Sequence, residues 1–161
     1  MAGVDFSTVM SADLLSYLNT LAAVGSTVGI IIAARQLNIT KKQAVTAFED
    51  GITREYRELA SRLPTGALLG EALTDEQHRE SFDEFYHYFD LSNEQIFLRQ
   101  RGRLSPATWD YWRDGISSNI RRPAFARAWA EISERSNGDF DELRRLIAAD
   151  FKVDPKSWPR R

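Results

Sequence analysis

One long stretch near the start of the chain contains no charged residue. Every position between Asp13 and Arg35 is uncharged, which gives 21 such positions over 14–34. As a helix this stretch would be about 31 Å long, close to the roughly 30 Å hydrocarbon core of a bilayer. The pattern predicts a transmembrane helix over 14–34. A buried core helix of a soluble protein is the alternative, because five polar residues interrupt the stretch: Ser16, Asn19, Thr20, Ser26 and Thr27.

The residues on either side of this stretch predict its orientation. Arg35, Lys41 and Lys42 follow it, whereas 1–13 contains no lysine or arginine. Cytoplasmic flanks of a membrane span carry the excess of basic residues. We therefore expect a single pass, with a short extracytoplasmic N-terminus over 1–13 and everything from residue 35 onward in the cytoplasm. A cleaved signal peptide fits less well, since it would need a basic segment before the apolar run.

Small residues recur every four positions within the predicted span. Gly25, Gly29 and Ala33 would form one stripe on a helix, which lets two helix backbones approach closely in lipid. Asn19 precedes the stripe and could donate a hydrogen bond to a second copy. The four residues predict the interface of a homo-oligomer.

The helical pattern continues after the uncharged stretch. Between Leu37 and Leu63 the apolar positions recur about every 3.7 residues when Lys41 is counted, close to the period of a straight helix. No proline occurs before Pro64, so nothing forces the helix to end earlier. We expect an amphipathic stalk helix over 35–63 that continues from the membrane helix.

Beyond Pro64, start signals divide the chain into several shorter helices. Thr74 and Gln77 form a capping-box pattern, Ser105 precedes Pro106, and Pro123 opens a further helix. A last helix is expected to begin near residue 139, and no alternating stretch indicates a strand.

These elements predict an all-α protein. An N-terminal transmembrane helix would continue into a long stalk helix, followed by a small cytoplasmic helical bundle over 64–154 and a tail over 155–161. Large aromatic residues at helical spacing are expected to form the core of the bundle. They are Phe85, Phe89, Trp109, Trp112, Phe125 and Trp129.

Composition excludes several classes of chemistry. The chain has 161 residues, no cysteine, two histidines and a formal net charge of -2. It therefore cannot form disulfides or thiolate metal sites. The near-neutral charge argues against a dedicated nucleic-acid-binding protein. No glycine-rich phosphate-binding loop is present, and the acidic clusters lack the spacing of a calcium loop. We expect neither a metal nor any other cofactor.

Two groups of residues are candidates for chemistry. His87 lies among aromatic residues and could act as a general base with Asp83 or Glu84, although no nucleophile pattern accompanies it, so no catalytic activity is expected. Three arginines at a predicted helix end could contact an anion, or could simply be a solvated helix terminus favoured by the helix dipole. They are Arg99, Arg101 and Arg103.

The spacing of the aromatic residues is similar to that in known protein families. The Trp109/Trp112 pair and the Pro123, Phe125 and Trp129 element resemble bacterial families of small single-pass membrane-anchored helical proteins of unknown function. The resemblance implies a layout of span, long helix and helical domain, and no active site. A weaker likeness, in layout alone, is to membrane effectors of bacterial defence systems.

The leading hypothesis is a self-associating interaction or assembly module anchored in the inner (cytoplasmic) membrane, which would recruit an unknown protein partner. A membrane-disrupting or pore-forming effector of a bacterial defence system is the alternative, with the polar residues of the span facing water. An unrecognised enzyme that uses His87 is a second alternative.

Overall fold

The computed structural model describes the backbone of residues 6–136 and 138–159, with side chains at Tyr17, Ser26, 29–136 and 138–159. The described residues form seven α-helices, one short 3-10 helix and no strand, which confirms the all-α prediction. The helices are α1 (Phe6–Ala60), α2 (Thr65–Leu69), α3 (Asp75–Glu80), α4 (Phe82–Gln100), α5 (Pro106–Ile120), α6 (Pro123–Arg135), α7 (Asp141–Ala148) and η1 (Pro155–Ser157).

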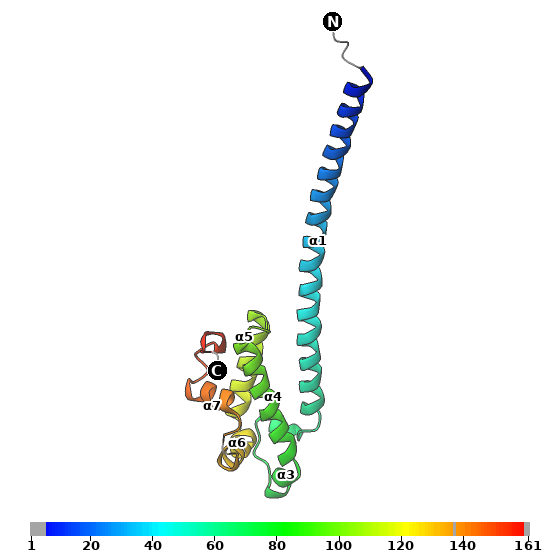
Figure 1. Cartoon of the computed structure of the whole chain (residues 1–161). Helices are drawn as coiled ribbons and strands as arrows, with labels where there is room; N and C mark the ends of the chain where they lie inside the picture. The colour runs from blue at the N-terminus through cyan, green and yellow to red at the C-terminus, as the bar shows by residue number, and fades with distance from the viewer. Residues whose placement is uncertain (1–5, 137, 160–161) are drawn as a thin grey trace. The chain divides into compact units, whose positions relative to one another are not determined.

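The chain divides into two compact units, Met1–Ala44 and Val45–Arg161. The first contains the N-terminal part of α1. The second contains the C-terminal turns of α1 and every later helix (Figure 1).

In the first unit the described side chains of α1 are exposed. Ile30, Ile31 and Ile32 are among them, as are Leu37 and Ile39. Successive residues on a helix point about 100° apart, so the three isoleucines cover more than one face. Within the part of the chain that the structure describes, no helix has a stretch long and apolar enough to cross a membrane.

Much of the predicted span, and half of its predicted interface, lies outside the described side chains. Asn19 and Gly25 fall there. Gly29 and Ala33 are described and exposed, and a Cβ added to Gly29 would meet no atom within 4 Å.

The second part of α1 is amphipathic. Ile52 and Leu59 are buried, as is Leu63 just beyond the helix, whereas Phe48 stays exposed. The helix ends at Ala60, three residues before the expected boundary, because the chain turns into Pro64, which cannot continue the hydrogen-bonded ladder.

Local capping residues begin the next helices as the sequence predicts. The Thr74 hydroxyl accepts from the backbone N–H of Gln77, and the Gln77 side chain accepts from the backbone N–H of Thr74, which confirms the capping box. The helix that starts there is interrupted at Ser81, where α3 ends and α4 begins.

The later helices also begin at predicted positions. The Ser105 hydroxyl accepts from the backbone N–H of Thr108 at the start of α5, and Pro123 is the first residue of α6. At α7 the Asn93 side chain of α4 accepts from the backbone N–H of Leu143.

Helix α4 lies at the centre of the Val45–Arg161 unit. It packs against α6, α7 and η1 (Figure 1). Five of the six aromatic residues expected in the core are buried, and the sixth, Trp129, is half-buried with its ring 5.0 Å from that of Phe89. Edge-to-face contacts join Phe125 to Phe85 and to Tyr88.

The segment after α7 is packed and not a free tail up to residue 159. Pro155 and Trp158 are buried, and the Gln100 side chain donates to the carbonyl oxygen of Pro159. The Asp154 carboxylate accepts two hydrogen bonds from the Arg99 guanidinium, at 2.9 and 2.6 Å. These contacts attach the segment to α4.

Candidate functional site

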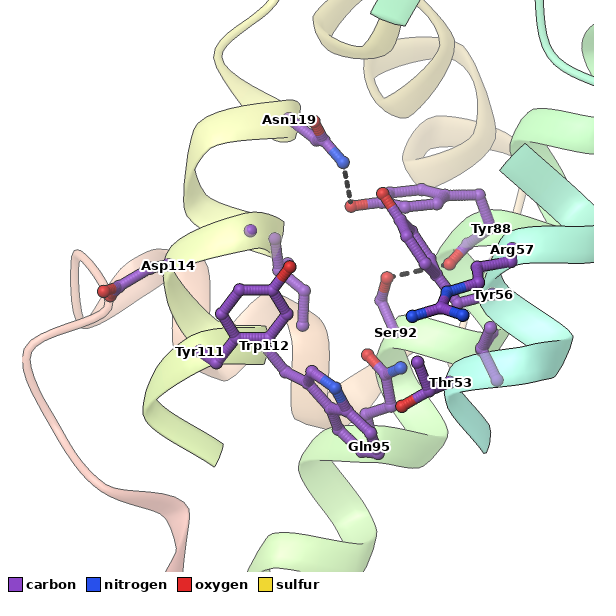
Figure 2. A pocket seen from close by; sticks show the side chains of 13 residues that line it. Thr53, Tyr56, Arg57, Tyr88, Ser92, Gln95, Tyr111, Trp112, Asp114 and Asn119 are labelled. Carbon is purple, nitrogen blue, oxygen red and sulfur yellow. Dashed lines mark hydrogen bonds between the residues drawn. The ribbon is translucent and has the colours of Figure 1, made fainter. Parts of the chain in front are cut away.

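A pocket of about 300 Å³ lies within the Val45–Arg161 unit, where the last turns of α1 meet α4 and α5 (Figure 2). Each of the three helices contributes polar and aromatic side chains. Thr53, Tyr56 and Arg57 come from α1, while the two later helices contribute among others Tyr88, Ser92, Gln95, Tyr111, Trp112, Asp114, Gly115 and Asn119.

Tyr88 is the best-anchored residue of the pocket. Its hydroxyl accepts a hydrogen bond of 3.1 Å from the Asn119 amide, and its carbonyl oxygen accepts one of 2.8 Å from the Ser92 hydroxyl (Figure 2). Burial raises the pKa of Tyr88 well above its ordinary value, because the phenolate would be poorly solvated. The hydroxyl therefore keeps its proton and has one hydrogen that it can donate.

Gln95 is one of several polar side chains of the pocket that have no hydrogen-bond partner among the described residues. The residue is 5% exposed, yet its amide makes no hydrogen bond with any described residue. Figure 2 shows it among the lining side chains, beside Thr53. In the part of the chain that the structure describes, fully buried side-chain polar atoms without a partner occur at His78, Glu84 and Trp109 but not at Gln95, so the Gln95 amide is accessible from the pocket and can pair with a polar group there.

Two charged residues line the pocket, Arg57 on α1 and Asp114 on α5. Asp114 accepts from Arg113 at 3.0 Å, but Arg113 also pairs with Asp110 at 3.1 Å, so the charge of Asp114 is only partly balanced within α5. Arg57 is exposed and makes no ion pair with the residues that the structure describes. The pocket is therefore lined by an unpaired positive charge on α1 and a partly balanced negative charge on α5.

Glu49 joins the α1 wall of the pocket to α5. One carboxylate oxygen accepts from the backbone N–H of Ser105 at 2.6 Å, and the other accepts from the Thr108 hydroxyl at 2.7 Å. The negative charge lies at the N-terminus of α5, where the helix dipole favours it. These two hydrogen bonds of Glu49 therefore hold the α1 wall of the pocket against the start of α5.

No known protein-family model, curated protein or solved structure matches this chain.

The predicted cluster of arginines is split by the fold. Arg99 is 4% exposed, and its guanidinium donates to Asp154 and to the carbonyl oxygen of Leu104, so it is not available to an external anion. The hydrogen bond to Asp154 raises the pKa of Arg99 and lowers that of the carboxyl group. Arg101 and Arg103 are exposed, and the Arg101 guanidinium lies over the Phe97 ring.

His87 is exposed and makes no described hydrogen bond with Asp83 or Glu84, the two carboxylates proposed to assist it. It lines a shallow depression between α1 and α4 together with Glu55, Glu58, Asp90 and Glu94 among others. No group of histidine and carboxylate side chains among the described residues is arranged to hold a metal ion.

His78, which the sequence did not single out, is the buried histidine. Its Nε2 atom lies 3.2 Å from a carboxylate oxygen of Glu131, joining α3 to α6. This hydrogen bond lowers the pKa of Glu131. His78 packs inside the bundle, where its ring contacts the rings of Phe82 and Phe85.

Sequence analysis also missed the pocket. Its residues come from three helices and can be far apart in the chain, as Tyr88 and Asn119 are, whose hydrogen bond joins positions 31 apart. The one available signal was a polar stripe of Ser92 and Gln95 beside the aromatic face of α4.

Proposed function

We propose that the protein is a single-pass, membrane-anchored binding module. The uncharged range 14–34 would hold it in the inner membrane, and the Val45–Arg161 unit would be the cytoplasmic binding part. The resemblance to small anchored bacterial proteins agrees with this division.

The observation that carries the proposal is the exposure of apolar residues on more than one face of α1. Ile30, Ile31 and Ile32 point in different directions, and each is at least half exposed. A single partner helix would cover one stripe, whereas lipid surrounds a helix on every side. The basic residues at 35, 41 and 42 support a cytoplasmic location for the chain that follows, because cytoplasmic flanks carry the excess of basic residues.

Self-association through the small-residue stripe is part of the proposal. Gly25, Gly29 and Ala33, with Asn19, would form the contact between copies in lipid. The described pair, Gly29 and Ala33, is exposed and leaves room for a second backbone.

Carbonate extraction of membranes tests the anchor. The full chain is expected to stay in the membrane pellet, and a chain truncated to begin at Val45 is expected in the supernatant. Extraction of the full chain by carbonate would contradict the anchor. Depolarisation of cells that express the full chain, but not the truncated one, would instead favour the pore-forming alternative.

Orientation can be measured separately, because the chain has no cysteine of its own. A membrane-impermeant maleimide should label Ala2→Cys in intact spheroplasts. It should label Arg79→Cys, at an exposed position of α3, only after lysis. The reverse pattern would place the helical unit outside.

A further inference from the structure

The residues that line the pocket between α1, α4 and α5 indicate which kind of molecule the helical unit could bind. This inference rests on the proposed role of that unit as the binding part and is independent of the membrane anchor.

The walls of the pocket favour a flat, apolar ring. The rings of Tyr56 and Tyr88 have centroids 6.4 Å apart and are tilted by 58°, and Trp112 lies on the α5 side. Tyr111, 78% exposed, lies at the mouth. Aromatic faces from three helices offer stacked and edge-to-face contacts to a ring placed between them.

The polar groups on the α1 and α4 sides of the pocket can bind a hydrogen-bond acceptor with negative charge, whereas Asp114 lies on the α5 side. The unpartnered Gln95 amide can donate two hydrogen bonds, and the protonated Tyr88 hydroxyl can donate one. Arg57 adds a positive charge that no described carboxylate neutralises. A guanidinium pairs with a carboxylate through two parallel hydrogen bonds, which suits this combination.

We propose that this pocket binds an aromatic carboxylate of one or two rings. The ring would lie against Tyr56, Tyr88 and Trp112, and the carboxylate would accept from Gln95 and pair with Arg57. The volume of about 300 Å³ is at the lower end of ligand pockets, which limits the ligand to a compact molecule.

Calorimetric titration of the full chain in phosphatidylcholine nanodiscs tests the proposal, with naphthoate as probe and uncharged naphthamide as its matched isostere. Saturable binding of naphthoate is expected, about tenfold tighter than that of naphthamide, since the charged group contributes on the order of one strong hydrogen bond. Absence of saturable naphthoate binding, or equal affinities for the two probes, would overturn the proposal.

Substitutions at two arginines of α1 locate the charge effect. Arg57→Gln should remove the preference for naphthoate over naphthamide. Arg54→Gln is the matched control, because Arg54 is exposed on the same helix but does not line the pocket. An equal loss of preference in both variants would mean a diffuse charge effect and would overturn the assignment to Arg57.

Two further variants test the cavity itself. Gly115 lines the pocket, and an added Cβ would meet no atom within 4 Å, so Gly115→Trp should fill the mouth without unfolding the unit and abolish binding of both probes. Gln95→Leu keeps the size of the side chain and removes its donors, so it should weaken naphthoate binding about tenfold. Wild-type affinity in a folded Gly115→Trp variant would place the bound probe elsewhere and overturn the proposal.

Discussion

The two parts of helix α1 have the same backbone conformation but different surroundings. Over 29–44 the described side chains are exposed, including three successive isoleucines. Over Val45–Ala60, Ile52 and Leu59 are buried, Glu49 caps α5, and Tyr56 faces Tyr88. The second part is thus held by contacts within the chain. The first part has no comparable contacts among its described side chains over 29–44, which is what the proposed contact with lipid requires.

The largest expected effect is on the unfolding free energy of the helical unit, to which the second part of α1 belongs. Trp109→Ala removes a buried ring from the core and should lower the free energy of unfolding of the helical unit by about 3–5 kcal/mol. All four tryptophans lie after Val45, so tryptophan fluorescence during urea denaturation reports that unit alone. Membrane retention of the variant should not change. A change in the unfolding free energy below 1 kcal/mol would show that the ring is not part of the core.

A matched pair of substitutions on α1 sharpens the comparison. Ile52→Ala should lower the unfolding free energy by about 2 kcal/mol, because a buried side chain is truncated. Ile31→Ala removes the same atoms from an exposed position and should change it by less than about 0.5 kcal/mol. The same urea titration measures both. Equal effects would mean that residues 29–44 contribute to the stability of the helical unit.

The part of the fold that sequence predicts is the part set by local chemistry. Thr74, Ser105 and Pro123 begin helices because each supplies a cap or a preset backbone angle within a few residues. Phe140 and Phe151, on either side of α7, adopt positive φ although neither residue is a glycine, so the sequence gives no sign of these turns. The packing around them, and not the local sequence, determines those turns.

The site was less predictable because its contacts are distant in the chain. Arg99 resembled an anion-binding residue by its neighbours, but its partner Asp154 is 55 positions later. Tyr88 was not among the residues expected in the core, and the α5 side chain that donates to its hydroxyl is 31 positions away. Periodicity identifies which face of α4 is apolar but not which neighbouring helix leaves a cavity beside it.

A smaller effect concerns the other end of the helical unit. Arg99 lowers the pKa of Asp154, so this carboxyl group stabilises the folded state fully above its ordinary pKa of about 4, and the contribution is lost as pH falls through the lowered value. Asp154→Asn should cost about 1 kcal/mol at pH 6, allowing for the partial exposure of the carboxylate.

The pH dependence distinguishes this ion pair from ordinary packing. The difference in unfolding free energy between wild type and Asp154→Asn should shrink when urea titrations are repeated near pH 3. A difference that stays constant between the two pH values would show that the asparagine disturbs packing and that the charge of Asp154 contributes little.

The smallest effect on stability is expected at Gly29, where the consequence should appear only between copies of the chain. A Cβ at Gly29 meets no atom within 4 Å, so Gly29→Ile should leave the unfolding free energy unchanged while it weakens self-association in mild detergent, measured by sedimentation equilibrium. Gly51→Ile is the matched control, because an added Cβ there also meets no atom within 4 Å, on the part of α1 that belongs to the helical unit. Weaker association in Gly29→Ile alone would assign the interface to the small-residue stripe. An unchanged oligomer in both variants would mean that the copies associate through a surface other than the small-residue stripe.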